Sequence, residues 1–221
     1  YNIIEFLIKR LKTKFDSRKI IIITSNSNQD KILEKIAFKE NIKIFKGEPK
    51  DVLLRMYKAA KKFKFRNFIS CTADNPFTDP GFAIKLMKYH IKNKNDLSIM
   101  KKVPLGTFSY AINFNGLKKS IKYKNSNNTE NWGGYFINNK KLKVGYFDPK
   151  FNFMNVNKKI RLTVDFPKDL KLIKAILNKS RKDQPNLKEI MKILKANSNM
   201  VKINLGIKQK KETKPIFKNL I

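Results

Sequence analysis

The chain has almost none of the side chains that build cross-linked or histidine-based sites. Its 221 residues include one cysteine, Cys71, and one histidine, His90. A single cysteine excludes an internal disulfide, and its place in a strand-like apolar run favours a small core residue. A lone histidine excludes a metal site made of several histidines, and a Ser-His-Asp set is left only if His90 serves it. We expect His90 at the surface or at a helix end.

Long apolar runs and glycine-rich signatures are also missing. The sequence has no apolar run of membrane-spanning length and no secretory h-region, so we expect a cytoplasmic protein that does not enter a membrane. It holds only eight glycines and contains neither a GxGxxG pattern nor a P-loop. Interpretations as a dinucleotide-binding or P-loop protein therefore lack support.

Acidic residues are scarce: 17 Asp and Glu stand against 50 Lys and Arg, for a formal net charge of +33. Such a charge suggests nucleic-acid binding. Only six of the basic residues are Arg, however, and the Lys residues are scattered among abundant Asn, Ile and Phe, which indicates a compositional bias over the whole surface. The basic, aromatic run at 61–65 could stack bases, but it stands alone. We expect diffuse affinity for phosphorylated ligands and polyanions, without specific nucleic-acid binding.

What is present is a regular alternation of predicted elements in a chain long enough for one domain with a real core. Apolar periodicity predicts four helices and three strands before residue 92. The predicted helices span 2–11, 30–39, 51–60 and 79–91, and the predicted strands span 18–24, 42–45 and 66–74. This alternation predicts an α/β fold with three layers, a doubly wound and mostly parallel sheet covered by helices on both faces.

After residue 96 the rhythm changes. We predict further strands at 97–100, 107–114, 142–148 and 151–155, the last two as a small β excursion, and a strand that returns to the main sheet and ends at Asp165. Further helices are predicted at 116–123, 130–138, 167–178 and 187–195. We expect residues 1–206 to form the domain and the lysine-rich residues 207–221 to form a loosely held basic tail.

The two most informative segments each end in Asp-x-Pro, at Asp74 and at Asp165. Ligands of a parallel sheet collect at the carboxyl ends of its strands. Two carboxylates placed there would hold a hard cation such as Mg²⁺ over a phosphate. Alternatively, Asp74 only forms a turn and Asp165 only caps the helix that Pro167 begins. We assign Asp79 and Asp169 mainly to helix starts.

Three other turns hold candidate binding residues. Gly47 lies in a turn before a helix that contains Arg55, so the turn amides and this guanidinium could grip a nucleotide, or the turn could be generic. Gly106 could shape a sugar pocket or only a loop. Glu130 could bind a substrate hydroxyl or serve as an acid at a helix N-terminus, and Asn131 and the only Trp follow it.

Together these segments resemble the cytidylyltransferase family that includes the acylneuraminate and 3-deoxy-manno-octulosonate cytidylyltransferases, and in particular its spore-coat-polysaccharide synthesis branch. Residues 72–80 (TADNPFTDP) and 161–170 (RLTVDFPKDL) are the most specific matches. Supporting matches lie, in the same order along the chain, at 20–25, 45–47, 51–55, 59–60, 104–106 and 129–130. The resemblance covers roughly residues 2–200.

The resemblance implies a nucleotide-diphospho-sugar transferase-like fold over residues 1–206. It also implies transfer of CMP from CTP to a sugar acid or related sugar, with release of pyrophosphate, for surface polysaccharide synthesis. On this basis Asp74 and Asp165 are the catalytic Mg²⁺ ligands. The resemblance places Gly47, Arg55 and Thr72 at the nucleotide and Gly106, Glu130 and Asn131 at the sugar. The implied partners are CTP and a small sugar, and a second copy of the chain is a further candidate.

Two departures from the family pattern matter. The family begins with a strand and a basic loop that holds the triphosphate, and this chain starts after that point. Asn131 also stands where the nearest relatives usually carry His. Because transfer needs fixed donors at the triphosphate, we expect a domain that is incomplete at its N-terminus and that turns over CTP poorly or not at all.

Two alternatives stay open at this stage. One is a glycosyltransferase or another nucleotidyltransferase on the same sheet, which would use the paired Asp residues differently. The other is a basic binding protein derived from such an enzyme and no longer catalytic.

Overall fold

The computed structural model describes residues 2–150, 160–209 and 214–218. Its strands are β1 Ile21–Ser25, β2 Lys43–Gly47, β3 Asn67–Ser70, β4 Leu97–Met100, β5 Tyr110–Asn113 and β6 Val144–Phe147. Its α-helices are α1 Ile3–Lys12, α2 Ile32–Lys39, α3 Val52–Lys62, α4 Pro80–Lys92, α5 Phe114–Tyr123, α6 Gly134–Ile137, α7 Pro167–Lys179 and α8 Leu187–Ala196. Short 3-10 turns occupy Ser17–Lys19, Asn28–Lys31 and Ser198–Ile203.

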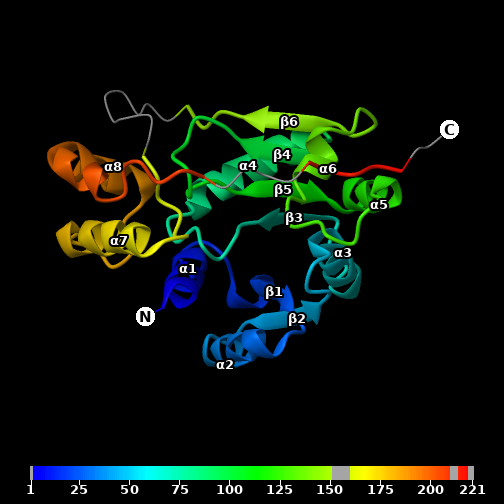
Figure 1. Ribbon diagram of the computed structural model, residues 1–221, viewed down its shortest axis with the longest axis horizontal. Coiled ribbons are helices and arrows are strands. Elements are labelled where there is room, and N and C mark those ends of the chain that lie inside the picture. Colours follow the sequence, from blue (N-terminus) through cyan, green and yellow to red (C-terminus); the bar gives the residue numbers. More distant parts are fainter. Residues whose placement is uncertain (1, 151–159, 210–213, 219–221) are drawn as a thin grey trace.

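The strands of the described ranges form two sheets, and the expected α/β class is confirmed (Figure 1). β1 and β2 pair in parallel. The larger sheet has the order β3-β5-β4-β6, in which β5 runs antiparallel to both of its neighbours and β4 is parallel to β6. The pairing is thus more mixed than the alternation of helices and strands predicted. Periodicity reveals which strands are buried, but it does not reveal their direction or partners.

Helices cover both faces of the larger sheet, as a three-layer fold requires. Neighbouring residues of β5 point to opposite faces: Ala111 packs with Leu86 of α4, whereas Ile112 packs with Leu53 of α3 and Leu117 of α5. All five side chains are fully buried. Residues that alternate in this way place one helix on one face and a helical layer on the other.

The helix starts were predicted well because side chains cap them. Asn2, Asp51, Asp79, Asn113 and Asn186 each accept hydrogen bonds from backbone N–H groups in the first turn of the helix that follows. Asp79 is followed by Pro80 at the first helical position, which supplies a preset φ and no unsatisfied N–H. Each cap satisfies donors that have no partner within the helix.

Several strands are shorter than predicted. The strand expected to end at Asp74 stops at Ser70, and the one expected from residue 107 starts at Tyr110. The predicted strand before Asp165 is reduced to one isolated parallel bridge between Leu105 and Arg161. The helix predicted over 130–138 is the short α6, and the predicted strand at 151–155 lies outside the described residues.

Arg10 connects helix α1 to the turns that precede α4 and α8. Its side chain is 2% exposed, and its guanidinium donates from Nε to the Thr78 carbonyl at 2.8 Å and from Nη1 to the Pro185 carbonyl at 2.6 Å. Burial lowers the pKa of Arg10 to about 10, against the opposing effect of Asp79. These bonds tie α1 to the turns that start α4 and α8.

Part of the basic C-terminal segment is paired with the body of the protein. Phe217 forms an antiparallel bridge with Lys124, the Asn125 N–H donates to the Ile216 carbonyl at 2.8 Å, and the Lys218 N–H donates to the Tyr123 carbonyl at 2.9 Å. The Phe217 ring also lies against Tyr135. Residues 216–218 are therefore attached to the body of the protein, with the Phe217 side chain half-buried.

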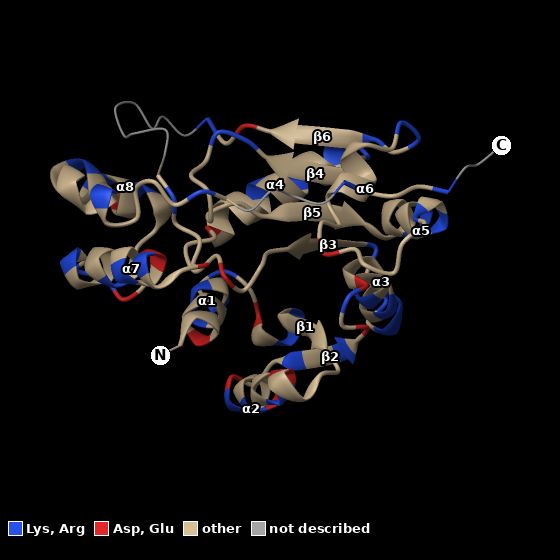
Figure 2. Ribbon diagram, in the orientation of Figure 1, with Lys and Arg blue, Asp and Glu red and all other residues tan. Residues whose placement is uncertain are grey.

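Basic side chains are spread over the molecule. Figure 2 shows Lys and Arg on elements from α2 to α8, with acidic residues interspersed. In this view the basic residues are not confined to one element. None of the helices that the structure describes is both long and apolar enough to cross a bilayer.

His90 is buried inside this framework and does not lie at the surface. It is 1% exposed near the end of α4, where Nδ1 lies 2.9 Å from Ser98 Oγ and Nε2 lies 3.2 Å from Asn67 Oδ1. Asn113 Nδ2 also donates to Asn67 Oδ1, so that oxygen accepts from Nε2–H and Nδ1 is left as an acceptor. Burial lowers the pKa of His90, and Asp96 acts in the opposite direction.

We predict that the free energy of unfolding falls as the pH decreases from 7 to 5. In the unfolded chain His90 binds a proton near its ordinary pKa of about 6.5. In the folded protein the pKa is lowered, so His90 binds a proton only at a lower pH. Stability present above that pH is lost below it, at up to about 1.4 kcal/mol per pH unit. Because the chain has one histidine, urea unfolding of a His90→Gln variant should show a much flatter profile over this range. Equal slopes in the two proteins would contradict the prediction.

Candidate active site

Two turns and one extended segment, far apart in the sequence, meet at one place, called here the junction of the three turns. The Val164 N–H donates to the Asp74 carbonyl at 2.9 Å, and the Leu162 N–H donates to the Leu105 carbonyl at 2.8 Å. The turn at 71–79, the turn at 104–107 and the extended segment at 160–166 are therefore held together by their backbones. This arrangement places Asp74 beside the residue that precedes Asp165.

Asp74 presents a carboxylate oxygen that has no protein partner. Its Oδ1 is buried and lacks a hydrogen bond within the described part of the chain. Burial first and the charge of Asp74 second raise the pKa of the Cys71 thiol to about 12. Cys71 is therefore a half-buried, unreactive thiol. A buried oxygen without a partner costs free energy unless a ligand satisfies it.

Asp165 is more open and pairs with Arg161. Its side chain is 35% exposed, and its Oδ2 accepts a hydrogen bond from Nη2 of Arg161. Arg161 is 5% exposed, and its Nε also donates to Oδ1 of Asp169 at 3.0 Å. Burial alone would lower the pKa of Arg161, but hydrogen bonds to Asp169 and Asp165 raise it overall.

Asp169 has a larger role than the helix start assigned to it. It is fully buried, its Oδ2 accepts the N–H groups of Asp165 at 3.1 Å and Phe166 at 3.0 Å, and its Oδ1 accepts from Asn204 at 2.8 Å. Although burial opposes it, the hydrogen bond from Arg161 and then that from Asn204 lower the pKa of Asp169. Sequence analysis missed Arg161 as an organising residue, although its spacing of four and eight residues from the two acids was a visible signal.

These residues fit a magnesium ion shared with a phosphate. No group of three or more His, Cys, Asp or Glu converges within the described ranges. Mg²⁺ does not require such a group, since it is commonly bound by one or two carboxylates together with substrate phosphates and water. The buried, unsatisfied Oδ1 of Asp74 is the kind of oxygen that such an ion would take.

Gly47 and Arg55 lie against each other. A Cβ at Gly47 would come within 3.1 Å of Arg55 Cγ, so the glycine lets this side chain cross the turn. Nη1 of Arg55 donates to the Glu48 carbonyl at 2.7 Å and the Pro49 carbonyl at 3.1 Å. Arg55 thus fixes the backbone of the 47–50 turn, and burial lowers its pKa while Asp30 and Asp51 oppose that shift.

A polar cluster at the carboxyl end of β1 was not predicted. Asp30 accepts hydrogen bonds from Thr24 Oγ1 at 2.7 Å and from Ser25 Oγ at 2.5 Å and Ser25 N–H at 3.0 Å. Those bonds lower the pKa of Asp30. The Asn26 N–H donates to the Gly47 carbonyl at 2.9 Å, which connects this cluster to the nucleotide candidate turn. These polar residues were visible in the sequence, but we interpreted the segment between the predicted strand and the predicted helix as an ordinary loop.

Thr72 and Gly106 lie at the junction of the three turns. Thr72 is exposed, and its carbonyl accepts the Asn75 N–H at 3.1 Å, so it shares the turn of Asp74. Gly106 has φ +89°, and a Cβ there would lie 2.1 Å from the Thr163 nitrogen. The glycine is therefore required for the close approach of two backbones, which is a structural reason independent of any sugar.

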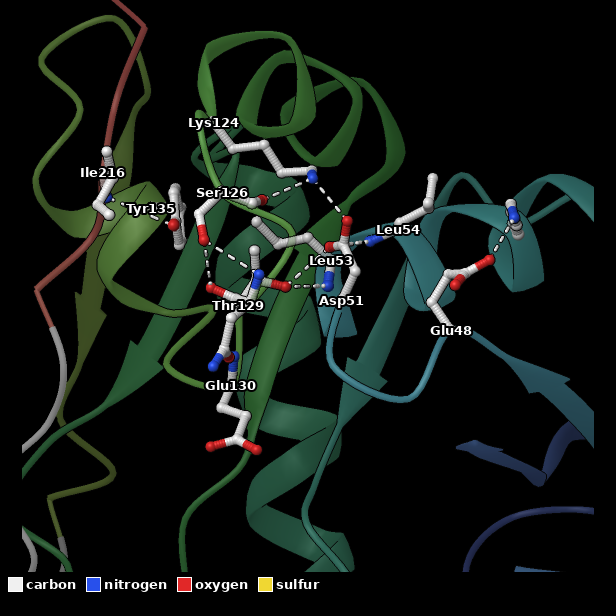
Figure 3. Close-up of polar contacts among 12 residues, drawn as sticks. Glu48, Asp51, Leu53, Leu54, Lys124, Ser126, Thr129, Glu130, Tyr135 and Ile216 are labelled. Atoms are coloured by element: carbon white, nitrogen blue, oxygen red, sulfur yellow. Dashed lines mark hydrogen bonds and ion pairs between the residues drawn. The ribbon is translucent and has the colours of Figure 1, made fainter. Parts of the chain in front are cut away.

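Glu130 and Asn131 belong to a separate loop beside α3. Glu130 is exposed, and Figure 3 shows its carboxylate pointing away from the buried polar contacts around Asp51. Asn131 is half-buried, and its carbonyl accepts the Gly134 N–H at 3.2 Å. The next residue, Trp132, is 8% exposed and packs edge-on against Tyr110.

Comparison with known proteins identifies the family. Residues 2–207 match the cytidylyltransferase family. The chain belongs to that family and is a CTP-dependent nucleotidyltransferase.

Two relatives extend the comparison. The chain is 30% identical over 210 residues to the uncharacterized protein MJ1063 of Methanocaldococcus jannaschii, covering 94% of this chain and 86% of that one. It is 27% identical over 186 residues to the spore coat polysaccharide biosynthesis protein SpsF of Bacillus subtilis, covering 81% and 77%.

Solved structures share the fold. A cytidylyltransferase from Leptospira borgpetersenii superposes with a TM-score of 0.83 at 19% identity, over 94% of this chain and 88% of that one. A CMP:2-keto-3-deoxy-manno-octonic acid synthetase complexed with CTP superposes with a TM-score of 0.60 at 12% identity, over 80% and 87%. The fold is thus that of the nucleotidyltransferases, as the resemblance implied.

We predict that Gly106→Ala destabilises the protein by at least about 2 kcal/mol, because a side chain would be strained at positive φ and would overlap the backbone of the 160–166 segment. Gly133→Ala is the matched control, since Gly133 has φ −60° and no atom lies within 4 Å of an added Cβ. Its stability should change by less than about 1 kcal/mol. Urea unfolding followed by circular dichroism measures both, and equal midpoints for the two variants would contradict the account.

Proposed function

We propose that this protein transfers CMP from CTP to a sugar acid or related sugar, with release of pyrophosphate, for the synthesis of a surface polysaccharide. The observation that carries the proposal is the junction at Asp74, whose carbonyl accepts the Val164 N–H and whose buried Oδ1 has no hydrogen bond within the described residues. Membership of the cytidylyltransferase family supports the nucleotide. The similarity to SpsF supports the polysaccharide, and the fold shared with the octonic acid synthetase supports a sugar acid.

Asp74 and Asp165 would hold Mg²⁺ at the triphosphate. When bound, the ion offsets the negative charge that develops on the phosphates during transfer. Arg161 orients the Asp165 carboxylate through its ion pair, and Asp169 holds Arg161 from the buried side. These residues supply fixed charges, which is the main protein contribution to this class of reaction.

The turn at 47–50 and Thr72 would bind the nucleotide. Arg55 donates to two carbonyls of the turn, which keeps the turn in one conformation while its charge stays near the phosphates. Thr72 is an exposed residue of the turn that contains Asp74, and its hydroxyl could bind a ribose or phosphate oxygen. Fixing these groups before binding reduces the entropy that the reaction must lose.

The sugar would contact Gly106, Glu130 and Asn131. Glu130 is exposed and can accept a hydrogen bond from a sugar hydroxyl. The sugar hydroxyl attacks the α-phosphorus, a new O–P bond forms, and the bond to the β-phosphate oxygen breaks so that pyrophosphate leaves. The acceptor proton is lost to solvent or to a nearby base.

We predict that CTP binds more tightly than UTP and that the difference requires magnesium. Isothermal titration with each nucleotide, with and without Mg²⁺, measures it. Asp74→Asn should weaken magnesium-dependent CTP binding by about 10- to 100-fold, because one carboxylate ligand is lost. A preference for UDP-sugars would favour a glycosyltransferase instead. Binding to polyanions with a steep salt dependence and no nucleotide preference would favour a basic binding protein.

The matched control is Asp16→Asn. Asp16 pairs with Arg18 only two residues away, and its side chain is 35% exposed. Loss of such a surface pair should change CTP affinity by less than about twofold. If both variants bind CTP equally well in the presence of magnesium, the assignment of Asp74 as a metal ligand is refuted.

A further inference from the structure

Another buried acid, Asp51, lies outside the junction of the three turns. It is 4% exposed and accepts the Leu54 N–H at 3.1 Å, which caps α3. The same oxygen, Oδ1, accepts the Thr129 hydroxyl at 2.9 Å, and Oδ2 forms an ion pair with Lys124 Nζ at 2.5 Å (Figure 3). Both oxygens are thus engaged by protein donors.

Thr129 makes the complementary contacts from the loop at 124–133. It is 1% exposed, and its hydroxyl oxygen accepts the Leu53 N–H at 3.0 Å while its proton goes to Asp51. Its own N–H donates to the Lys50 carbonyl at 3.0 Å. Three bonds therefore attach residue 129 to the start of α3, and two of them need a hydroxyl that donates and accepts at once.

The start of the 124–133 loop is fixed by other bonds. Lys124 Nζ also donates to the Ser126 carbonyl at 2.8 Å, so the ion pair with Asp51 spans the first turn of the loop. The C-terminal segment adds the Asn125 to Ile216 bond, and the Ile216 N–H lies 3.4 Å from the Tyr135 hydroxyl. Glu130 and Asn131 thus follow directly on a residue that has almost no freedom to move.

The first turn of α3 also contacts the 47–50 turn, which is the candidate nucleotide-binding turn. Lys50, whose carbonyl holds Thr129, is the last residue of the 47–50 turn, and Arg55 braces that turn from the other side. One helix start therefore connects the 47–50 turn with the 124–133 loop. Because Arg55 holds the turn independently, loss of the Thr129 contacts would loosen the loop more than the turn.

We propose that Asp51 is a positioning residue that, through Thr129, holds Glu130 and Asn131 in place for the sugar acceptor. This inference rests on the proposed function, since it takes the 124–133 loop as the acceptor side of the site. Asp51 acts without touching the acceptor. Its effect is to limit the positions of the loop relative to the nucleotide, which is how small displacements far from the reacting atoms change binding and rate.

The test compares Thr129→Val with Thr129→Ser. Valine keeps the shape but removes both hydroxyl bonds, whereas serine keeps them, so the serine variant is the matched control. Asp51→Asn is the second variant, because it keeps the size of the side chain but loses the ion pair with Lys124. The readout that needs no ligand is acrylamide quenching of Trp132, the only Trp in the chain and three residues from Thr129.

We expect Thr129→Val and Asp51→Asn to increase quenching of Trp132. They should also weaken binding of 2-keto-3-deoxy-manno-octonic acid, the acceptor probe, by about tenfold, with CTP affinity changed by less than about threefold. Thr129→Ser should behave like the unmodified protein in every measurement. A residue that only stabilised the fold would affect both ligands equally.

Equal weakening of both ligands, or no change in quenching or acid affinity in either variant, would overturn the inference. If the unmodified protein binds neither CTP nor the acid, the proposed function fails, and the quenching comparison still decides whether Asp51 and Thr129 position the loop. Unchanged quenching in both variants would then refute that role as well.

Discussion

Hydrogen bonds between backbone groups, not side chains, hold the candidate active site together. The bonds from Val164 to Asp74 and from Leu162 to Leu105 join three segments that no local element connects. Since these two bonds involve only peptide groups, they do not use the carboxylates of Asp74 and Asp165. The one demand on the sequence is Gly106, where any side chain would meet the backbone of the 160–166 segment.

The ion pair between Arg161 and Asp169 completes this arrangement on its buried side. A buried ion pair costs free energy when its charges leave water, and it is retained only when further hydrogen bonds satisfy both partners. Here Asn204 and the N–H groups of Asp165 and Phe166 do so. The orientation of Asp165 therefore depends on a fully buried network, whereas the carboxylate of Asp74 depends on the turn after β3. The two acids are thus held by different means.

The sequence predicted most helices and the positions of most strands, because caps and apolar periodicity are local signals. Strand pairing was less predictable: the apolar run before Asp165 reflects burial, and its extended backbone pairs with a turn instead of a sheet. In the site, residues 74 and 165 could be paired from their positions after apolar runs. The contacts of Asp51 with Thr129 could not, because both residues also suit ordinary helix caps and loops.

The contacts of residues 214–218 with the 123–125 segment have a consequence for how the protein is made. Helices α3 and α5 emerge early in synthesis, but the loop between α5 and α6 gains its last partners only when Ile216 and Phe217 have been added. Domains generally fold as units during or after translation. The 124–133 loop can therefore reach its final form only after residues 216 and 217 have left the ribosome, whereas the 47–50 turn has Arg55 as a partner much earlier.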